Sequence, residues 1–164
     1  MRTLYLLRHA KSSWKDASLV DFERPLKGRG RDAAEQMGLF LASKKVSLSA
    51  LIVSPAVRTR QTIDIVLRHA PLGIEPQFDL RIYEATLATL VQLVSDIEDD
   101  KQSVMLVGHN PGMEEMLAFL TRESRHMPTC ALARIGLDCA SWKEIGRGMG
   151  KLEWFVTPKD LPDD

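Results

Sequence analysis

The sequence is poor in cysteine and has no excess of charge of either sign. Its 164 residues include only two cysteines, and 22 Lys and Arg residues balance 22 Asp and Glu residues. So balanced a charge argues against a basic nucleic-acid-binding surface and against a polybasic membrane anchor. The two cysteines do not form a Cys-x-x-Cys pair, which argues against a zinc ribbon or a redox motif.

Long hydrophobic runs are also missing. No apolar run approaches the roughly 18 residues that a membrane-spanning helix needs. The apolar stretch before Arg8 is too short for a signal peptide. We therefore expect a cytoplasmic protein with no membrane or nucleic-acid partner. In that compartment Cys130 and Cys139 should be reduced thiols, with a disulfide between them as the alternative.

Short apolar runs alternate with amphipathic stretches along the first three quarters of the chain. Three of the runs, typical of buried parallel strands, are Thr3–Leu7, Ala50–Val53 and Val104–Val107. Apolar residues at helical spacing predict helices over Gly30–Lys44, Ile63–Ala70, Leu87–Val94 and Met113–Leu120. Strands that alternate with helices predict an α/β fold of three layers, in which helices cover both faces of a mostly parallel central sheet.

The C-terminal part has a different pattern. Two β-like segments, Cys130–Asp138 and Leu152–Thr157, flank a glycine-rich stretch. They predict a closing pair of strands, of which at least one is antiparallel. We expect a single domain over residues 1–164 with a frayed tail at 158–164.

Polar residues collect where the predicted strands end. The first strand runs into Arg8 and His9, and a later one runs into His109. Ser54-Pro55 and Asn110-Pro111 each predict a helix N-cap followed by proline at the first helical position. Because ligands of open α/β sheets bind beyond the carboxyl ends of the strands, two helix N-termini would face one crevice. That arrangement predicts an anion site.

A second arginine supports an anion site. Arg58 falls in the first turn of its predicted helix, where the helix dipole disfavours a cation. A bound dianion would account for a cation there beside Arg8, whereas an arginine that merely reaches solvent is the alternative. His9 and His109 lie at the same edge, but no third ligand has a similar placement and the arginines would repel a metal ion. We therefore expect no metal and no cofactor.

Four segments together resemble the histidine phosphatase superfamily, which has a phosphoglycerate mutase-like fold. They are Leu-Leu-Arg-His-Ala-Lys-Ser, Ser-Pro-Ala-Val-Arg-Thr-Arg-Gln-Thr, Tyr-Glu-Ala and Val-Gly-His-Asn-Pro-Gly. The short chain and the Glu-Arg-Pro-Leu stretch are similar to the small SixA-type branch, the phosphohistidine phosphatases. The resemblance implies a minimal, uncapped form of the fold. Ala10 departs from the family pattern, which has glycine at that position.

The resemblance also implies roles for individual residues. His9 would be the nucleophile that accepts the phosphoryl group, Arg8 and Arg58 would hold its oxygens, and His109 would be the second histidine of the pocket. Glu84 takes the place of the family's acidic proton donor. Its alternative is an ordinary exposed loop carboxylate.

Two further residues are weaker candidates for phosphate binding. Ser12 lies in the loop after His9, and Arg24 could reach over the pocket from the same loop. For Ser12 the alternative is a plain loop serine. For Arg24 it is a surface ion pair with Asp21 or Glu23, worth less than about 1 kcal/mol.

Short connections between the elements predict an open pocket. Such a pocket suits a phosphohistidine displayed on a protein, such as a phosphorelay domain, and encloses a small metabolite poorly. We expect a metal-independent phosphatase that also takes up free phosphate or sulfate. A general phosphatase of small phosphomonoesters is the alternative. A non-catalytic phosphate-binding module is disfavoured, because simple binding does not require His9.

Overall fold

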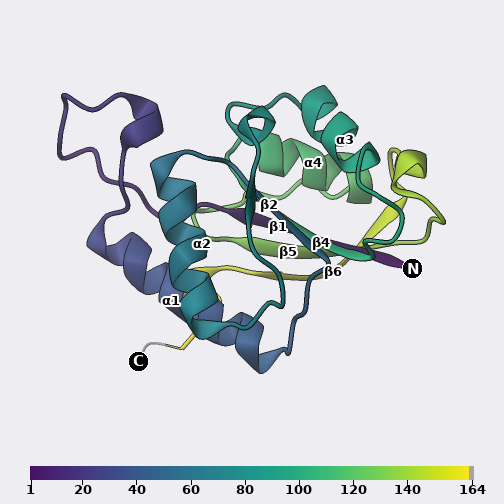
Figure 1. Cartoon of the computed structure of the whole chain (residues 1–164), viewed down its shortest axis with the longest axis horizontal. Coiled ribbons are helices and arrows are strands. Elements are labelled where there is room, and N and C mark those ends of the chain that lie inside the picture. Colours follow the sequence, from purple (N-terminus) through teal and green to yellow (C-terminus); the bar gives the residue numbers. More distant parts are fainter. Residues whose placement is uncertain (163–164) are drawn as a thin grey trace.

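A mixed β-sheet runs through the middle of the molecule (Figure 1). The computed structural model describes residues 1–162, which form six strands in the spatial order β3-β2-β4-β1-β5-β6. The strands are β1 (Arg2–Arg8), β2 (Ala50–Val53), β3 (Gln77–Phe78), β4 (Ser103–Gly108), β5 (Leu132–Leu137) and β6 (Gly150–Val156). The first four are parallel, and β5 and β6 run antiparallel to their neighbours. The predicted strands and the antiparallel closing pair are confirmed.

Helices cover both faces of this sheet, as predicted. Helices α1 (Gly28–Ser43) and α2 (Val57–His69) lie on one face, and α3 (Leu87–Ser95) and α4 (Gly112–Thr121) lie on the other (Figure 1). Two separate clusters of buried side chains fill the two interfaces. In α2 the buried residues include Ile63 and Val66, which recur at helical spacing and meet the sheet. No helix in residues 1–162 is long and apolar enough to cross a membrane.

The predicted start of α2 was wrong by two residues and that of α4 by one residue. Helix α2 begins at Val57 with Ala56 as its N-cap, and α4 begins at Gly112 with Pro111 as its N-cap. The side chain of Ser54 still accepts a hydrogen bond from the backbone N–H of Ala56, at 3.3 Å. The serine therefore stabilises the turn before the helix instead of the helix itself.

The tail that the sequence predicts to be frayed begins with a regular turn. Pro158–Asp160 form a 3₁₀ helix, η4, in which Thr157 and Asp160 cap one another through hydrogen bonds of 2.9 and 3.1 Å. Leu161 is partly buried and packs against the core cluster that contains Met37 and Leu41 of α1. Residues 163–164 lie outside the described part of the chain. Both cysteines are free thiols, as expected, with Cys130 buried and Cys139 partly buried.

Residues 12–27 form an arm that projects from the body between β1 and α1 (Figure 1). The arm closes at its base through a bridge between Ser12 and Leu26, and the backbone N–H of Ser13 donates to Pro25 at 2.8 Å. A short 3₁₀ helix, η1 (Asp21–Glu23), lies inside it. Both ends of the arm are therefore anchored beside the end of β1.

The start of α1 packs tightly against the loop after β1. A Cβ added at Gly30 would overlap the carbonyl oxygen of Lys11, whereas at Gly28 nothing lies within 4 Å. We expect Gly30→Ala to lower the free energy of unfolding by about 2 kcal/mol or more, because backbone must shift to admit the methyl group. Gly28→Ala, the control in the same helix turn, should leave it unchanged or raise it. Urea denaturation of the two variants measures the difference, and equal stabilities would contradict the close packing.

Candidate active site

The two histidines lie side by side because of the register of two parallel strands. Arg8, the last residue of β1, pairs with Gly108, the last residue of β4. The next residue along each strand is a histidine, and the backbone N–H of His9 donates to Gly108 at 3.0 Å. The rings of His9 and His109 consequently lie 5.2 Å apart between their centres. Both predicted histidines therefore meet at the carboxyl edge of the sheet.

His9 is held as a neutral ring with one nitrogen free. Its Nδ1 lies 2.7 Å from the carbonyl oxygen of Ala10. That oxygen only accepts hydrogen bonds, so Nδ1 carries the proton and Nε2 keeps its lone pair. Burial is the main cause that lowers the pKa of His9 to about 4. The hydrogen bond to Ala10, the next-largest effect, raises it, and the charges of Arg58, Arg8 and Arg24 lower it further. The ring is thus an unprotonated nitrogen base at neutral pH.

Ala10 fits the loop after His9 without backbone strain. It is fully buried and is not among the described residues with a positive φ. Its N–H donates to Thr62 Oγ1 at 3.0 Å, and the same hydroxyl donates to the carbonyl of Arg58 at 2.7 Å. The alanine at this position is therefore compatible with the bond that orients His9.

His109 is engaged at both ring nitrogens. Arg58 Nη2 lies 3.2 Å from Nδ1, and because a guanidinium only donates, Nδ1 is unprotonated. Nε2 then carries the proton and donates to Ser54 Oγ at 2.8 Å. Burial, followed by His9 and Arg58, lowers the pKa of His109 to about 3. Sequence reasoning assigned Ser54 only a capping role and missed this contact.

The two arginines approach the histidines from different elements. Arg8 ends β1 and donates from Nη1 to the carbonyl of Met127 at 3.0 Å, and its buried Nε has no hydrogen-bond partner among the described residues. Arg58 stands in the first turn of α2, where it is 7% exposed. Its Nη1 and Nη2 donate to the carbonyl and the carboxylate of Asp21 at 2.8 and 3.0 Å. A buried and a partly buried cation therefore lie beside two neutral imidazoles.

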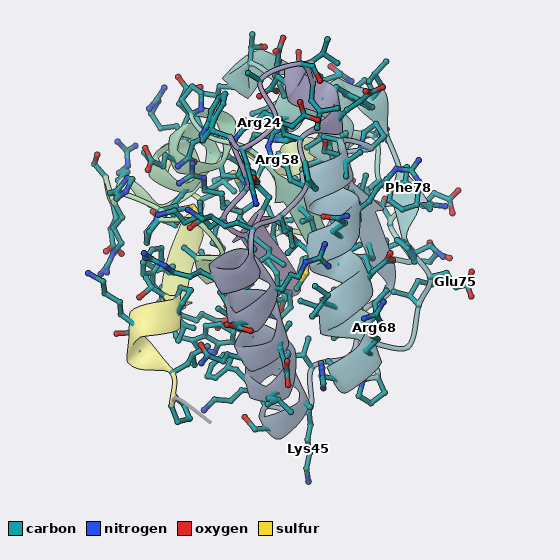
Figure 2. All side chains as sticks on the ribbon, turned by 90° about the vertical axis from the view of Figure 1, so that its left-hand side faces the viewer. Arg24, Lys45, Arg58, Arg68, Glu75 and Phe78 are labelled. Carbon is teal, nitrogen blue, oxygen red and sulfur yellow. The ribbon has the colours of Figure 1, made fainter. Side chains whose placement is uncertain are left out.

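These groups line a cleft of about 320 Å³. Its wall is rich in cations and contains no carboxyl group among the described residues: it consists of Arg8, His9, Lys11, Ser12, Trp14, Arg24, Lys27, Arg58, His109, Asn110 and Thr129. Figure 2 shows Arg24 and Arg58 together at one end of the molecule, beside the start of α2, and Arg68 near its other end. Such a cleft is suited to a compact polyanion.

The weaker candidates Ser12 and Arg24 both line the cleft but are bonded to each other. Arg24 Nη2 donates to Ser12 Oγ, and its Nε donates to the carbonyl of Ser13 at 3.2 Å. Its Nη1 pairs with Asp21 at 2.9 Å, as the surface-ion-pair alternative predicts, but the guanidinium is buried. Trp14 covers its face at 3.2 Å. Arg24 thus stabilises the arm and adds positive charge to the wall.

Glu84 does not lie in this cleft. It follows Tyr83 with a φ of 53° and lines a neighbouring hollow of about 370 Å³, which shares His109 and Asn110 with the cleft. The side chain is exposed and makes no hydrogen bond to any residue in the described part of the chain. The structure thus matches the exposed-carboxylate alternative in its free state and leaves Glu84 next to the site.

Asp21 and Tyr83 complete the surroundings of the site, and sequence reasoning did not single them out. The hydroxyl of Tyr83 donates to Asp21 Oδ2 at 2.6 Å, and its ring stands edge-on to His109 at 5.4 Å. The only signal in the sequence was the spacing of three residues between Asp21 and Arg24. Nothing in the sequence links Asp21 to Arg58, which follows it by 37 residues.

The depressed histidine pKa values predict a pH-dependent stability. They lie near 4 and 3 in the folded protein, below the unfolded value of about 6.5, so the unfolded chain binds more protons between these limits. Stability is therefore complete above about pH 6.5 and is lost as the pH falls, by about 2 kcal/mol or more between pH 7 and pH 5. Urea denaturation at the two pH values measures the change. His9→Asn should reduce it and His69→Gln should not.

Three comparisons with known proteins find relatives of this chain. A model of the histidine phosphatase superfamily (branch 1) matches residues 4–100. An uncharacterised chloroplast protein of Arabidopsis thaliana is 33% identical over 96% of this chain and 78% of its own length. The phosphohistidine phosphatase SixA of Escherichia coli is 27% identical over 96% of this chain and 95% of its own length. A structure of the protein histidine phosphatase SixA with tungstate has a TM-score of 0.83 at 23% identity, covering 96% and 98% of the chains.

Proposed function

The chain belongs to the histidine phosphatase superfamily, and from this premise we propose that it hydrolyses phosphohistidine on a protein through a covalent phospho-His9 intermediate. The observation that carries the choice of substrate is the absence of a carboxyl group from the described wall of the cleft. A phosphoester needs an acid to protonate its leaving oxygen. A phosphohistidine releases an imidazole, which solvent can protonate, so a cleft without an acid suits it.

The first chemical step is attack by His9 on phosphorus. Nε2 supplies the electron pair, because Nδ1–H is bonded to the carbonyl of Ala10. The bond from phosphorus to the substrate imidazole breaks, and that imidazole takes a proton from solvent. One P–N bond replaces another, so the transfer is close to balanced in energy. Water then attacks phospho-His9, which releases inorganic phosphate and restores the ring.

Charge neutralisation comes from the arginines. Arg8 and Arg58 present guanidinium N–H groups that match phosphoryl oxygens in pairs. Both are held in place before substrate arrives, because each is buried or bonded in the free protein. Stabilisation of transition-state charge by preorganised donors is the main task in phosphoryl transfer.

His109 assists as a hydrogen-bond donor in its other tautomer. In the free protein its Nδ1 accepts from Arg58. When a phosphoryl oxygen accepts the hydrogen bond from Arg58 Nη2 in place of His109, a proton on Nδ1 lets His109 donate to another phosphoryl oxygen. The hydroxyl of Ser54 supports both tautomers, since it accepts from Nε2–H or donates to Nε2.

The supporting comparisons concern the relatives' own activities. A relative 27% identical to this chain is named phosphohistidine phosphatase SixA, and a structural neighbour binds tungstate, an oxyanion of phosphate-like shape. By analogy the cleft should take up phosphate or sulfate, and a phosphorelay domain is the kind of partner expected.

A small-molecule phosphomonoesterase is the second candidate, and the position of Glu84 favours it. The carboxylate lines the hollow next to the cleft, and His109 and Asn110 line both. A modest movement of the loop would bring it to a leaving oxygen. The two functions therefore differ in how much they depend on this carboxylate.

The substitution Glu84→Gln separates the two functions. We expect it to reduce phenyl phosphate hydrolysis by about 10²-fold, as loss of a general acid does, and phosphate release from a histidine-phosphorylated phosphorelay domain by less than about threefold. Glu115→Gln, in the same hollow, is the matched control and should change neither rate. Equal losses on both substrates, or faster wild-type turnover of phenyl phosphate, would favour the phosphomonoesterase.

A further inference from the structure

Asp21 lies at the centre of the side chains that surround the cleft. Its Oδ2 accepts from Arg58 Nη2 at 3.0 Å and from the Tyr83 hydroxyl at 2.6 Å. Its Oδ1 accepts from Arg24 Nη1 at 2.9 Å, and its backbone carbonyl accepts from Arg58 Nη1 at 2.8 Å. Asp21 thereby contacts Arg24 of the arm and Arg58 of α2, which both line the cleft.

Asp21 holds Arg58 at two of its nitrogens. Because Nη1 and Nη2 bond to two different oxygens of the same residue, the plane of the guanidinium is fixed. Nη2 also donates to His109, so the contacts form a closed ring of Asp21, Arg58, His109 and Tyr83. A free arginine side chain samples many rotamers, and this ring removes that freedom before substrate arrives.

The position of Asp21 shows whether its carboxylate holds the arginines for the substrate or competes with the phosphoryl group for them. A carboxylate on two arginines could occupy the place of the phosphoryl group. Arg24 and Arg58 both line the cleft, however, whereas Asp21 does not. Its carboxylate therefore lies outside the wall of the cleft, whereas the two guanidinium groups that it binds form part of that wall.

The charge state of Asp21 agrees with this geometry. Burial on its own would raise the pKa of the carboxyl group, but hydrogen bonds from Tyr83, Arg24 and Arg58 outweigh it and lower the pKa to about 2. The carboxylate is thus ionised throughout the neutral range. An anion that never gains a proton there is unsuited to acid catalysis and suited to holding cations.

We propose that Asp21 is a positioning residue, which holds the guanidinium of Arg58 toward the transferring phosphoryl group from outside the wall of the cleft. The proposal rests on the phosphatase function given above. It assigns a task to the arm: besides forming one wall of the cleft, the arm delivers the anion that orders a buried arginine of α2.

The substitution Asp21→Asn tests the proposal by kinetics. We expect kcat to fall about 10- to 100-fold, because a small misplacement of a catalytic cation has a large effect, with KM changed less than about threefold. The matched control is Asp16→Asn, since Asp16 lies on the same arm and the described hydrogen bonds of its side chain go to Ser18. An unchanged kcat with tighter inorganic phosphate binding would identify Asp21 as a competitor and overturn the proposal. Equal losses in both variants would reduce Asp21 to a general support of the arm.

A double-mutant comparison tests whether Asp21 acts through Arg58. In an Arg58→Ala background, Asp21→Asn should change kcat/KM by less than about twofold, because the group that it positions is gone. A further 10-fold loss would contradict the proposal. Thermal unfolding of every variant shows whether the fold is intact, and Asp21→Glu should recover part of the lost kcat.

A spectroscopic measurement separates this proposal from the proposed function. In ¹H–¹⁵N spectra the guanidinium of Arg58 should give sharp, slowly rotating N–H signals in the wild type and in Asp16→Asn, and broadened signals in Asp21→Asn. The measurement needs no turnover. A wild type that shows these signals but releases no phosphate from any substrate refutes the proposed function alone. Sharp signals in Asp21→Asn refute the positioning role alone.

Discussion

Replacement of His9 by alanine is expected to abolish phosphate release, with a loss of at least about 10⁴-fold in kcat, as removal of an enzyme's nucleophile usually produces. The structure leaves Nε2 of His9 as an unprotonated nitrogen in the cleft, because Nδ1 donates to Ala10. His109 is no substitute, since Arg58 and Ser54 engage both of its nitrogens. Phosphate release from a histidine-phosphorylated protein measures the effect.

Binding and trapping experiments complete the test of His9. Calorimetry with inorganic phosphate should give an affinity within a few-fold of wild type, because Arg8 and Arg58 are still present. Acid-labile, base-stable label should appear on the wild type during turnover and not on His9→Ala, as expected of a P–N bond. A variant that keeps a tenth of the activity, or label at another residue, would contradict a covalent role for His9. Retained binding with no wild-type turnover would instead indicate a binding module.

Replacement of Arg58 by lysine is expected to lower kcat/KM by about 10²- to 10³-fold, although the charge is conserved. An ammonium group is a single point charge. Its three N–H groups radiate from one nitrogen, whereas the guanidinium reaches the carbonyl of Asp21 from Nη1 and the Asp21 carboxylate and His109 from Nη2. The variant therefore loses the paired contact to phosphoryl oxygens and also the donor that sets the tautomer of His109. Steady-state kinetics on the histidine-phosphorylated protein and on phenyl phosphate measure it.

Arg60→Lys is the matched control for that substitution. Arg60 lies on the same helix, two residues further along, but it is exposed and its guanidinium stacks on Phe78 at 4.2 Å. Its replacement should leave kcat/KM within about threefold of wild type. If Arg58→Lys also kept a third of the wild-type value, charge alone would account for the contribution of Arg58, and paired hydrogen bonding would be excluded as its basis.

The secondary structure was predictable because it follows from local patterns. Apolar residues at helical spacing, such as Ile63 and Val66, and short apolar runs, such as Ala50–Val53, record which face of each element is buried. Helix starts were less predictable. Ser54-Pro55 has the composition of a cap, yet the serine hydroxyl bonds to His109 and the helix begins at Val57. A tertiary contact thus uses the group that a local rule assigned to the helix.

The sequence by itself determined the elements, the order of the strand ends and the identity of the groups that meet there: His9 and His109 follow apolar strands, and Arg8 and Arg58 stand at the same edge. These features depend on residues close together in the chain. Only the tertiary structure decided that Glu84 stays outside the cleft and that Asp21 holds Arg58. The reason is physical: an irregular arm and a loop with positive φ carry no periodic pattern, so their side chains are placed by contacts with distant segments.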